Sequence, residues 1–171
     1  MSALRLINET EITSGVAQVN ITDVFSADFD IYKITVSELN SAGSIGANLR
    51  FINTSGSSIT SSVYDFANLN MKTNASFAEA RTVNNDDWDD WFGNPSTTTS
   101  TAQGVGYIFN PFDSSSYTFG IWQNSQPTRI HKKIGVLKQT SSISGFAFFT
   151  NDGQNFSSGL VRTYGLRVDN G

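Results

Sequence analysis

Residues 84–92, NNDDWDDWF, combine four aspartates and two tryptophans with no basic residue among them. Carboxylate oxygens at alternate positions, as in Asp87 and Asp89, are ligands of the kind that calcium prefers. Trp88 and Trp91 are three residues apart, so they would share a side in a helical turn but not in a regular strand. Their rings could bind a sugar, contact another subunit or anchor this segment in the core.

Catalysis by this segment would need two facing carboxylates, about 5–10 Å apart in a cleft, as in glycoside hydrolysis. The carboxylates that could contribute are those of Glu79, Asp86, Asp87, Asp89 and Asp90. They are close in sequence, whereas catalytic pairs normally come from separate strands, and a local acidic run is typical of a solvated loop. We therefore rank packing or an interface formed by Trp88 and Trp91 first, a calcium site second and catalysis third.

The remaining catalytic and metal patterns are poorly represented. The only histidine, His131, lies in RIHKKIG beside two lysines, and no G-x-S-x-G motif accompanies it, so a Ser-His-acid triad is not indicated. One histidine and no cysteine exclude the common zinc sites, and the twelve-residue calcium loop is absent. We expect no enzyme activity and no cofactor, and keep only Asp87 and Asp89 as calcium candidates.

The composition indicates a folded chain with a hydroxyl- and amide-rich surface. Of the 171 residues, 38% are hydrophobic and 12% aromatic, but only 15% are charged, against about 25% in typical soluble domains. The net charge of −4 argues against binding to a nucleic acid backbone. The chain start lacks a secretory signal and no apolar run reaches the ~20 residues of a membrane span, so we expect synthesis in the cytoplasm and no membrane partner.

Alternation of apolar and polar residues predicts strands and almost no helix. In DIYKITVSEL, residues 30–39, Tyr32, Ile34 and Val36 fall on one face. Ten segments read in this way: 4–7, 17–21, 30–39, 48–53, 62–69, 105–110, 117–123, 130–138, 143–150 and 160–168. About eight to ten short strands indicate one all-β domain over residues 1–171, an antiparallel β-sandwich of jelly-roll type, with a barrel as the second choice.

Three local features complete this expected layout. The Asp152–Gly153 pair follows FAFF and predicts a hairpin, because its turn needs a positive φ. Residues 75–83 are the one candidate for a helical turn. Residues 72–104 form an excursion longer than ordinary connections, and thus a candidate functional or interface loop.

Several segments together resemble small structural proteins of tailed bacteriophages, especially phages of marine cyanobacteria. The resemblance rests on LRLINETEITSGVAQVNITDVFSADFDIYKITV, LRFIN, GYIFNP and ISGFAFFTNDGQNFSSGLVRTYGL. Within them, the group's short motifs correspond to Phe25, Ser26, residues 29–32, Asn110–Pro111, Gly153, residues 158–159 and residues 164–166. The resemblance carries no catalytic residues, and the acidic segment 84–92 departs from it.

The resemblance implies a bacteriophage virion structural protein, exposed on the particle as a capsid decoration or as a tail fibre or appendage subunit. Members of the group are often trimeric, so the expected partners are further copies of the chain and other virion proteins such as capsid or tail. The alternative is a carbohydrate-binding module that recognises a host surface glycan through Trp88, Trp91 or Trp122.

Overall fold

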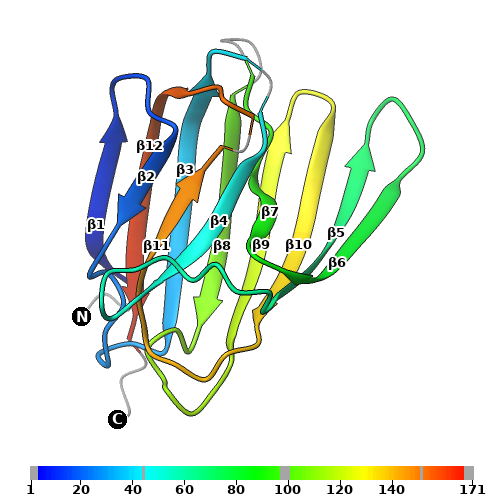
Figure 1. Cartoon of the computed structure of the whole chain (residues 1–171). Helices are drawn as coiled ribbons and strands as arrows, with labels where there is room; N and C mark the ends of the chain where they lie inside the picture. Colours follow the sequence, from blue (N-terminus) through cyan, green and yellow to red (C-terminus); the bar gives the residue numbers. More distant parts are fainter. Residues whose placement is uncertain (1–3, 44, 97–100, 151, 168–171) are drawn as a thin grey trace.

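The computed structural model describes residues 4–43, 45–96, 101–150 and 152–167. Within these ranges the chain forms twelve strands and no helix. The strands make two antiparallel sheets, one of eight strands and one of four, that face each other across a shared core (Figure 1). This confirms the predicted all-β sandwich, while the jelly-roll type stays a prediction.

The strand order along each sheet shows how the chain passes between the layers. The eight-stranded sheet runs β1 (Leu4–Ile12), β12 (Phe156–Leu166), β3 (Ile31–Ser41), β8 (Ala102–Phe109), β9 (Thr118–Gln126), β10 (Arg129–Leu137), β5 (Tyr64–Lys72), β6 (Ala78–Asn85). The four-stranded sheet runs β2 (Gln18–Ile21), β11 (Ile143–Phe149), β4 (Ala47–Asn53), β7 (Trp88–Gly93). The chain therefore changes sheet at most connections, and only the pairs β5–β6, β8–β9 and β9–β10 are consecutive neighbours.

All ten predicted strands are present, and two further strands were missed. Residues 75–83, predicted as a helical turn, instead lead into β6, whose Ala, Glu and Arg residues are good helix formers. Pairing of β6 with β5 overrides this local preference. The expected long loop at 72–104 thus contains β6, β7 and the start of β8; its residues 97–100 lie outside the described part.

The predicted hairpin at Asp152–Gly153 is wrong, although Gly153 does have a positive φ of 75°. The preceding strand β11 pairs with β2 and β4, whereas the following strand β12 pairs with β1 and β3. The turn therefore carries the chain from one sheet to the other. A positive φ fixes a local backbone shape, and this shape serves a crossover as well as a hairpin.

Burial follows the strand alternation where one face meets the core. In β3, Tyr32, Ile34 and Val36 point inward, as predicted. The strand β11 is buried at every residue because it lies in the middle of the smaller sheet. Tyr64 connects the layers: its hydroxyl accepts from the Phe51 backbone N–H and donates to the Ile59 carbonyl, both at 3.0 Å.

The eight-stranded sheet extends beyond the four-stranded one. In Figure 1 the strands β2, β11, β4 and β7 lie over one part of the larger sheet, and the β5–β6 hairpin projects past them. Every residue of β6 except Asn85 is exposed, so neither face of this strand is covered. We call the side of the larger sheet that faces the smaller sheet its inner face, and the opposite side its outer face.

The indole ring of Trp88 fills the space between β7 and the larger sheet. A Cβ atom added at Gly135 would lie 2.5 Å from Trp88 Cε2, and one added at Gly120 would lie 2.8 Å from Trp88 Cη2. Both distances are shorter than real Cβ contacts, so only glycine fits beneath the ring at these places. The glycines thus allow β9 and β10 to approach a tryptophan that is fully buried.

Replacing Gly135 by Ala should therefore destabilise the sandwich, because neither the buried ring nor the strand can move freely. We expect the free energy of unfolding to fall by about 1–3 kcal/mol, as for other overpacked cores. Urea denaturation measures this change. The matched control is Gly43→Ala, where the added carbon would meet only the flexible Gln154 side chain at 3.4 Å; equal stability of the two variants would contradict the packing argument.

Candidate functional site

The second half of the acidic segment, from Trp88 onward, forms the edge strand β7, which carries a β-bulge. Asp90 has a positive φ of 51°, and the β4–β7 register shifts between Ala47 and Leu49. This irregularity turns Trp88 and Trp91 to the same side, where their ring centroids lie 4.3 Å apart. Both rings have no exposed surface, which contradicts the interface role predicted for them and supports the core-anchor alternative.

The carboxylates of this segment engage protein groups. Asp86 forms a short ion pair with Arg50, and Asp87 lies 3.5 Å from the same guanidinium. Asp87 also accepts from the amides of Asn48 and Asn85, at 3.3 and 3.1 Å. Burial raises the pKa of Asp87 to about 6, despite the favourable amide and guanidinium contacts.

The calcium candidates gain no support from this geometry. The Asn48 amide nitrogen donates to the Asp87 carboxylate at 3.3 Å, and the Asn48 amide oxygen accepts from the Asp90 backbone N–H at 2.9 Å. Burial, followed by the neighbouring Asp90 charge, raises the pKa of Asp89. Over the described ranges no three histidine, aspartate or glutamate side chains converge, whereas calcium takes about 6–8 oxygen ligands.

A row of polar side chains crosses the inner face near one end of β9, β10 and β5. His131 on β10 pairs with Asn124 on β9 and with Asn70 on β5. His131 and Asn124 are buried, and neither ring nitrogen of His131 nor either amide atom of Asn124 has a hydrogen-bond partner. Buried Lys133 follows on the same face and donates to the Asp90 carbonyl.

This environment keeps His131 uncharged. Burial, then the positive charges of Lys133, Arg129 and Lys72, lowers the pKa of His131 to about 4, while the Asp90 charge acts in the opposite direction. Burial likewise lowers the pKa of Lys133 to about 8. Among the described residues no hydroxyl or carboxylate is hydrogen-bonded to His131.

The most distinctive surface lies on the outer face of the larger sheet. Apolar side chains point outward from adjacent strands and remain exposed there: Val105, Phe119, Ile121, Ile134 and Leu69. The register places Tyr107, Ile121, Ile134 and Ala67 side by side across β8, β9, β10 and β5. We call the two sets together the outer apolar face; it consists of Ala67, Leu69, Val105, Tyr107, Phe119, Ile121 and Ile134.

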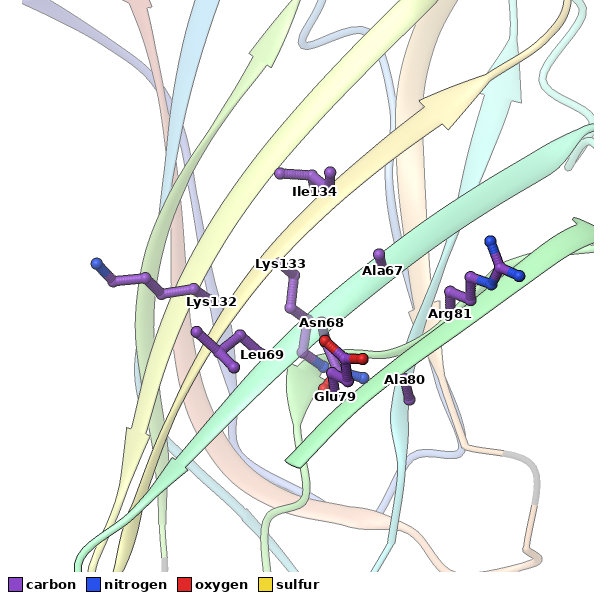
Figure 2. A pocket seen from close by; sticks show the side chains of 9 residues that line it. All are labelled: Ala67, Asn68, Leu69, Glu79, Ala80, Arg81, Lys132, Lys133 and Ile134. Carbon is purple, nitrogen blue, oxygen red and sulfur yellow. The ribbon is translucent and has the colours of Figure 1, made fainter. Parts of the chain in front are cut away.

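Part of the outer apolar face is hollowed into a trough between β10 and the β5–β6 hairpin. Its apolar end is a cavity of about 480 Å³ that includes Phe119, Ile121, Ile134 and Val83. Its charged end is a cavity of about 780 Å³ that includes Leu69, Glu79, Arg81, Lys132 and Ile134. Figure 2 shows this second cavity, where the side chains of Lys132 and Lys133 leave β10 in different directions.

Sequence reasoning missed this surface, although a signal was present. In β9 the residues Phe119 and Ile121 alternate with Gly120 and Trp122, so apolar residues occur on both faces of one strand. Trp122 is buried, as are Trp88 and Trp91, and no tryptophan is available to stack on a sugar. The exposed aliphatic and aromatic residues of the outer face are therefore the best candidate for molecular recognition.

Known proteins give no further guide to this surface. No family model matches the chain, and neither the curated proteins nor the solved structures contain a match. Within the described ranges there is no helix of the length and apolar character that a membrane span requires. Function must accordingly be inferred from the geometry.

Asp87 and His131 should influence the pH dependence of stability in opposite directions. The raised pKa of Asp87 means that the folded state holds its proton from pH 3.8 up to about 6, so this contribution to stability is lost as pH rises through that window. The lowered pKa of His131 means that its contribution is lost as pH falls from 6.5 to about 4.

Relative to the unmodified chain, Asp87→Asn should therefore make the free energy of unfolding rise more steeply between pH 4 and pH 6. His131→Gln should make it rise less steeply or fall. Urea denaturation at several pH values measures both slopes, and slopes that change in the same direction would refute the assignment of these two environments.

Proposed function

We propose that this protein is a non-catalytic structural subunit of a tailed-bacteriophage virion, exposed on the particle as a capsid decoration or a tail fibre or appendage subunit. The observation that carries the proposal is the outer apolar face, which is continuous across four strands of the larger sheet. Continuous exposed apolar surface in a folded protein is typical of sites that bind another protein, a membrane or a ligand. The proposed partners are further copies of this chain and other virion proteins such as capsid or tail.

Assembly is also consistent with how the aromatic residues are divided. Large rings such as Trp88, Trp91 and Phe92 fill the core, whereas Phe119 and Tyr117 stay at the surface. Apolar residues at the centre of an interface, surrounded by polar side chains, supply most of the energy of protein association. We propose a closed homo-oligomer, a trimer, in line with the resemblance and with the general preference for closed symmetry.

The connectivity supports the jelly-roll type as the finer description of the fold. The strands β1, β12, β3 and β8 are adjacent in the larger sheet, and β2, β11, β4 and β7 make up the smaller one. Successive members of this set along the chain alternate between the sheets at every step except β4 to β7, which are neighbours in the smaller sheet. Two four-stranded layers connected in this way are typical of double-sheet jelly rolls, which occur in viral capsid proteins. The two hairpin additions, β5–β6 and β9–β10, extend the larger sheet beyond this set.

The carbohydrate-binding alternative is weakened by burial of all three tryptophans, on which it depended. An enzyme is less favoured still, because neither ring nitrogen of His131 has a hydrogen-bond partner among the described residues, so no base is positioned against a nucleophile. A structural role requires neither exposed tryptophans nor catalytic groups. It requires a stable sandwich and a surface that binds other protein subunits.

The proposal is tested by the location of the chain in purified virus particles and by a variant of the outer apolar face. Ile121→Glu places a charge on exposed surface, so the domain should fold but incorporate at least tenfold less into particles, measured by quantitative mass spectrometry. The control is Asn20→Glu on exposed β2 of the other sheet. Absence of the unmodified chain from particles, or equal incorporation of both variants, would refute the proposal.

A further inference from the structure

The β5–β6 hairpin has the form of an arm that is not used within its own domain. Both faces of β6 are open, and the smaller sheet does not reach it (Figure 1). Phe77, just before β6, has 65% of its surface exposed, the largest value among the bulky apolar residues. An aromatic ring held out in solvent on a projecting hairpin gains nothing from folding of the single chain.

The trough described above offers an apolar cavity that the chain itself leaves empty. Ile134, at its centre, has 62% of its surface exposed, and Val83, at its edge, has 61%. Phe119 and Ile121 complete the apolar lining. The same molecule thus presents an unburied aromatic knob and an unfilled apolar hollow.

Phe77 cannot fill the apolar end of its own trough. That end lies beside Val83, and an extended strand of six residues places Phe77 roughly 20 Å away. The pairing of β6 with β5, from Asn70 opposite Ala78 to Phe66 opposite Thr82, keeps the hairpin extended. The apolar end of a trough that the Phe77 ring can enter is therefore that of another copy.

On the arm and on β10 alike, an apolar residue and a charged residue lie two positions apart in a strand, and the two charges have opposite sign. Glu79 lies two residues after Phe77 on the arm, and Lys132 lies two residues before Ile134 on β10, a separation of about 6.6 Å in each extended strand. A Phe77 ring seated over Ile134 of a second copy brings Glu79 to Lys132 of that copy when the strands run antiparallel. Among the described residues neither Glu79 nor Lys132 takes part in an ion pair within the chain.

We infer that copies of this chain associate head to tail, with Phe77 of one copy in the apolar end of the trough of the next and Glu79 beside Lys132. Because the knob and the hollow are different surfaces, the contact is heterologous, and repetition closes a ring when the rotation permits. This inference deepens the proposed function: it rests on assembly through the outer apolar face and names the segment that covers it.

Cysteine cross-linking tests the pairing directly, because the chain contains no native cysteine. The antiparallel alignment that places Phe77 over Ile134 also brings Arg81 to Ile130 of the second copy, and both positions are exposed. Arg81→Cys and Ile130→Cys leave the proposed contact residues intact; the two variants are purified separately, mixed at micromolar concentration and oxidised. Head-to-tail association predicts that the mixture forms the mixed disulfide at least tenfold more than the mixture of Ser14→Cys with Ile130→Cys. Ser14 is an exposed residue between β1 and β2 and serves as the matched control.

Two results would overturn the inference. Equal cross-linking of the control mixture would mean random collision, and efficient homodimers of Arg81→Cys alone would mean that two arms meet symmetrically. Circular dichroism of each variant checks that it is folded.

Charge reversal supplies an independent measurement without disulfides. Glu79→Lys or Lys132→Glu alone should raise the dissociation constant of the oligomer about two- to fivefold, and the double variant should restore it, as for partly exposed ion pairs. Sedimentation of the purified protein reports this constant without particles. A chain found in virions that neither cross-links nor self-associates would refute this inference alone, whereas a self-associating chain absent from virions would refute only the proposed function.

Discussion

The position of Trp88 over two glycines is the packing constraint on which the remaining structure depends. The smaller sheet ends at β7, and the indole ring of Trp88 lies between this edge strand and the glycines of β9 and β10. Trp88 also packs edge-on against Phe51 and Tyr64, at centroid distances of 4.9 and 6.2 Å. Together with the Phe92–Trp122 ring contact and the bond from Lys133 to the Asp90 carbonyl, this ring sets the separation of the sheets at the place where one of them stops.

This constraint also determines which surface is left for other molecules. The tryptophans are buried, and the exposed apolar residues of β8, β9, β10 and β5 form a continuous surface on the outer face of the larger sheet. The nine residues of β9 supply both faces of the larger sheet. Gly120 and Trp122 are buried on the inner face, and Phe119 and Ile121 are exposed on the outer face. The low charge content leaves this outward surface without the dense lysine and glutamate cover that would oppose association.

The sequence was sufficient for the strands that alternate regularly and insufficient where the backbone departs from regularity. The alternation of Tyr32, Ile34 and Val36 predicted β3 and its buried face correctly. β7 was missed because its aspartates disfavour strands and because the bulge at Asp90 breaks the period of two. That bulge also explains why two tryptophans three residues apart share one side of a strand.

Long-range pairing was likewise beyond local reasoning. The Asp152–Gly153 turn could be located, but whether β11 and β12 pair with each other depends on strands distant in sequence. The outer apolar face was recognisable only after the register had aligned Tyr107, Ile121 and Ile134 across three strands. Surface patches of this kind belong to the sheet as a whole, and no single segment contains them.

The openness of β6 on both faces has a consequence for how this protein can diverge. Side chains in a strand that contributes nothing to the core can be exchanged with little effect on folding, whereas Trp88, Gly120 and Gly135 tolerate almost no change. Natural variation should therefore accumulate fastest in the arm outside Phe77 and Glu79, and slowest beneath the indole ring. The same scaffold could acquire new binding specificities by altering one hairpin while its folding remains protected.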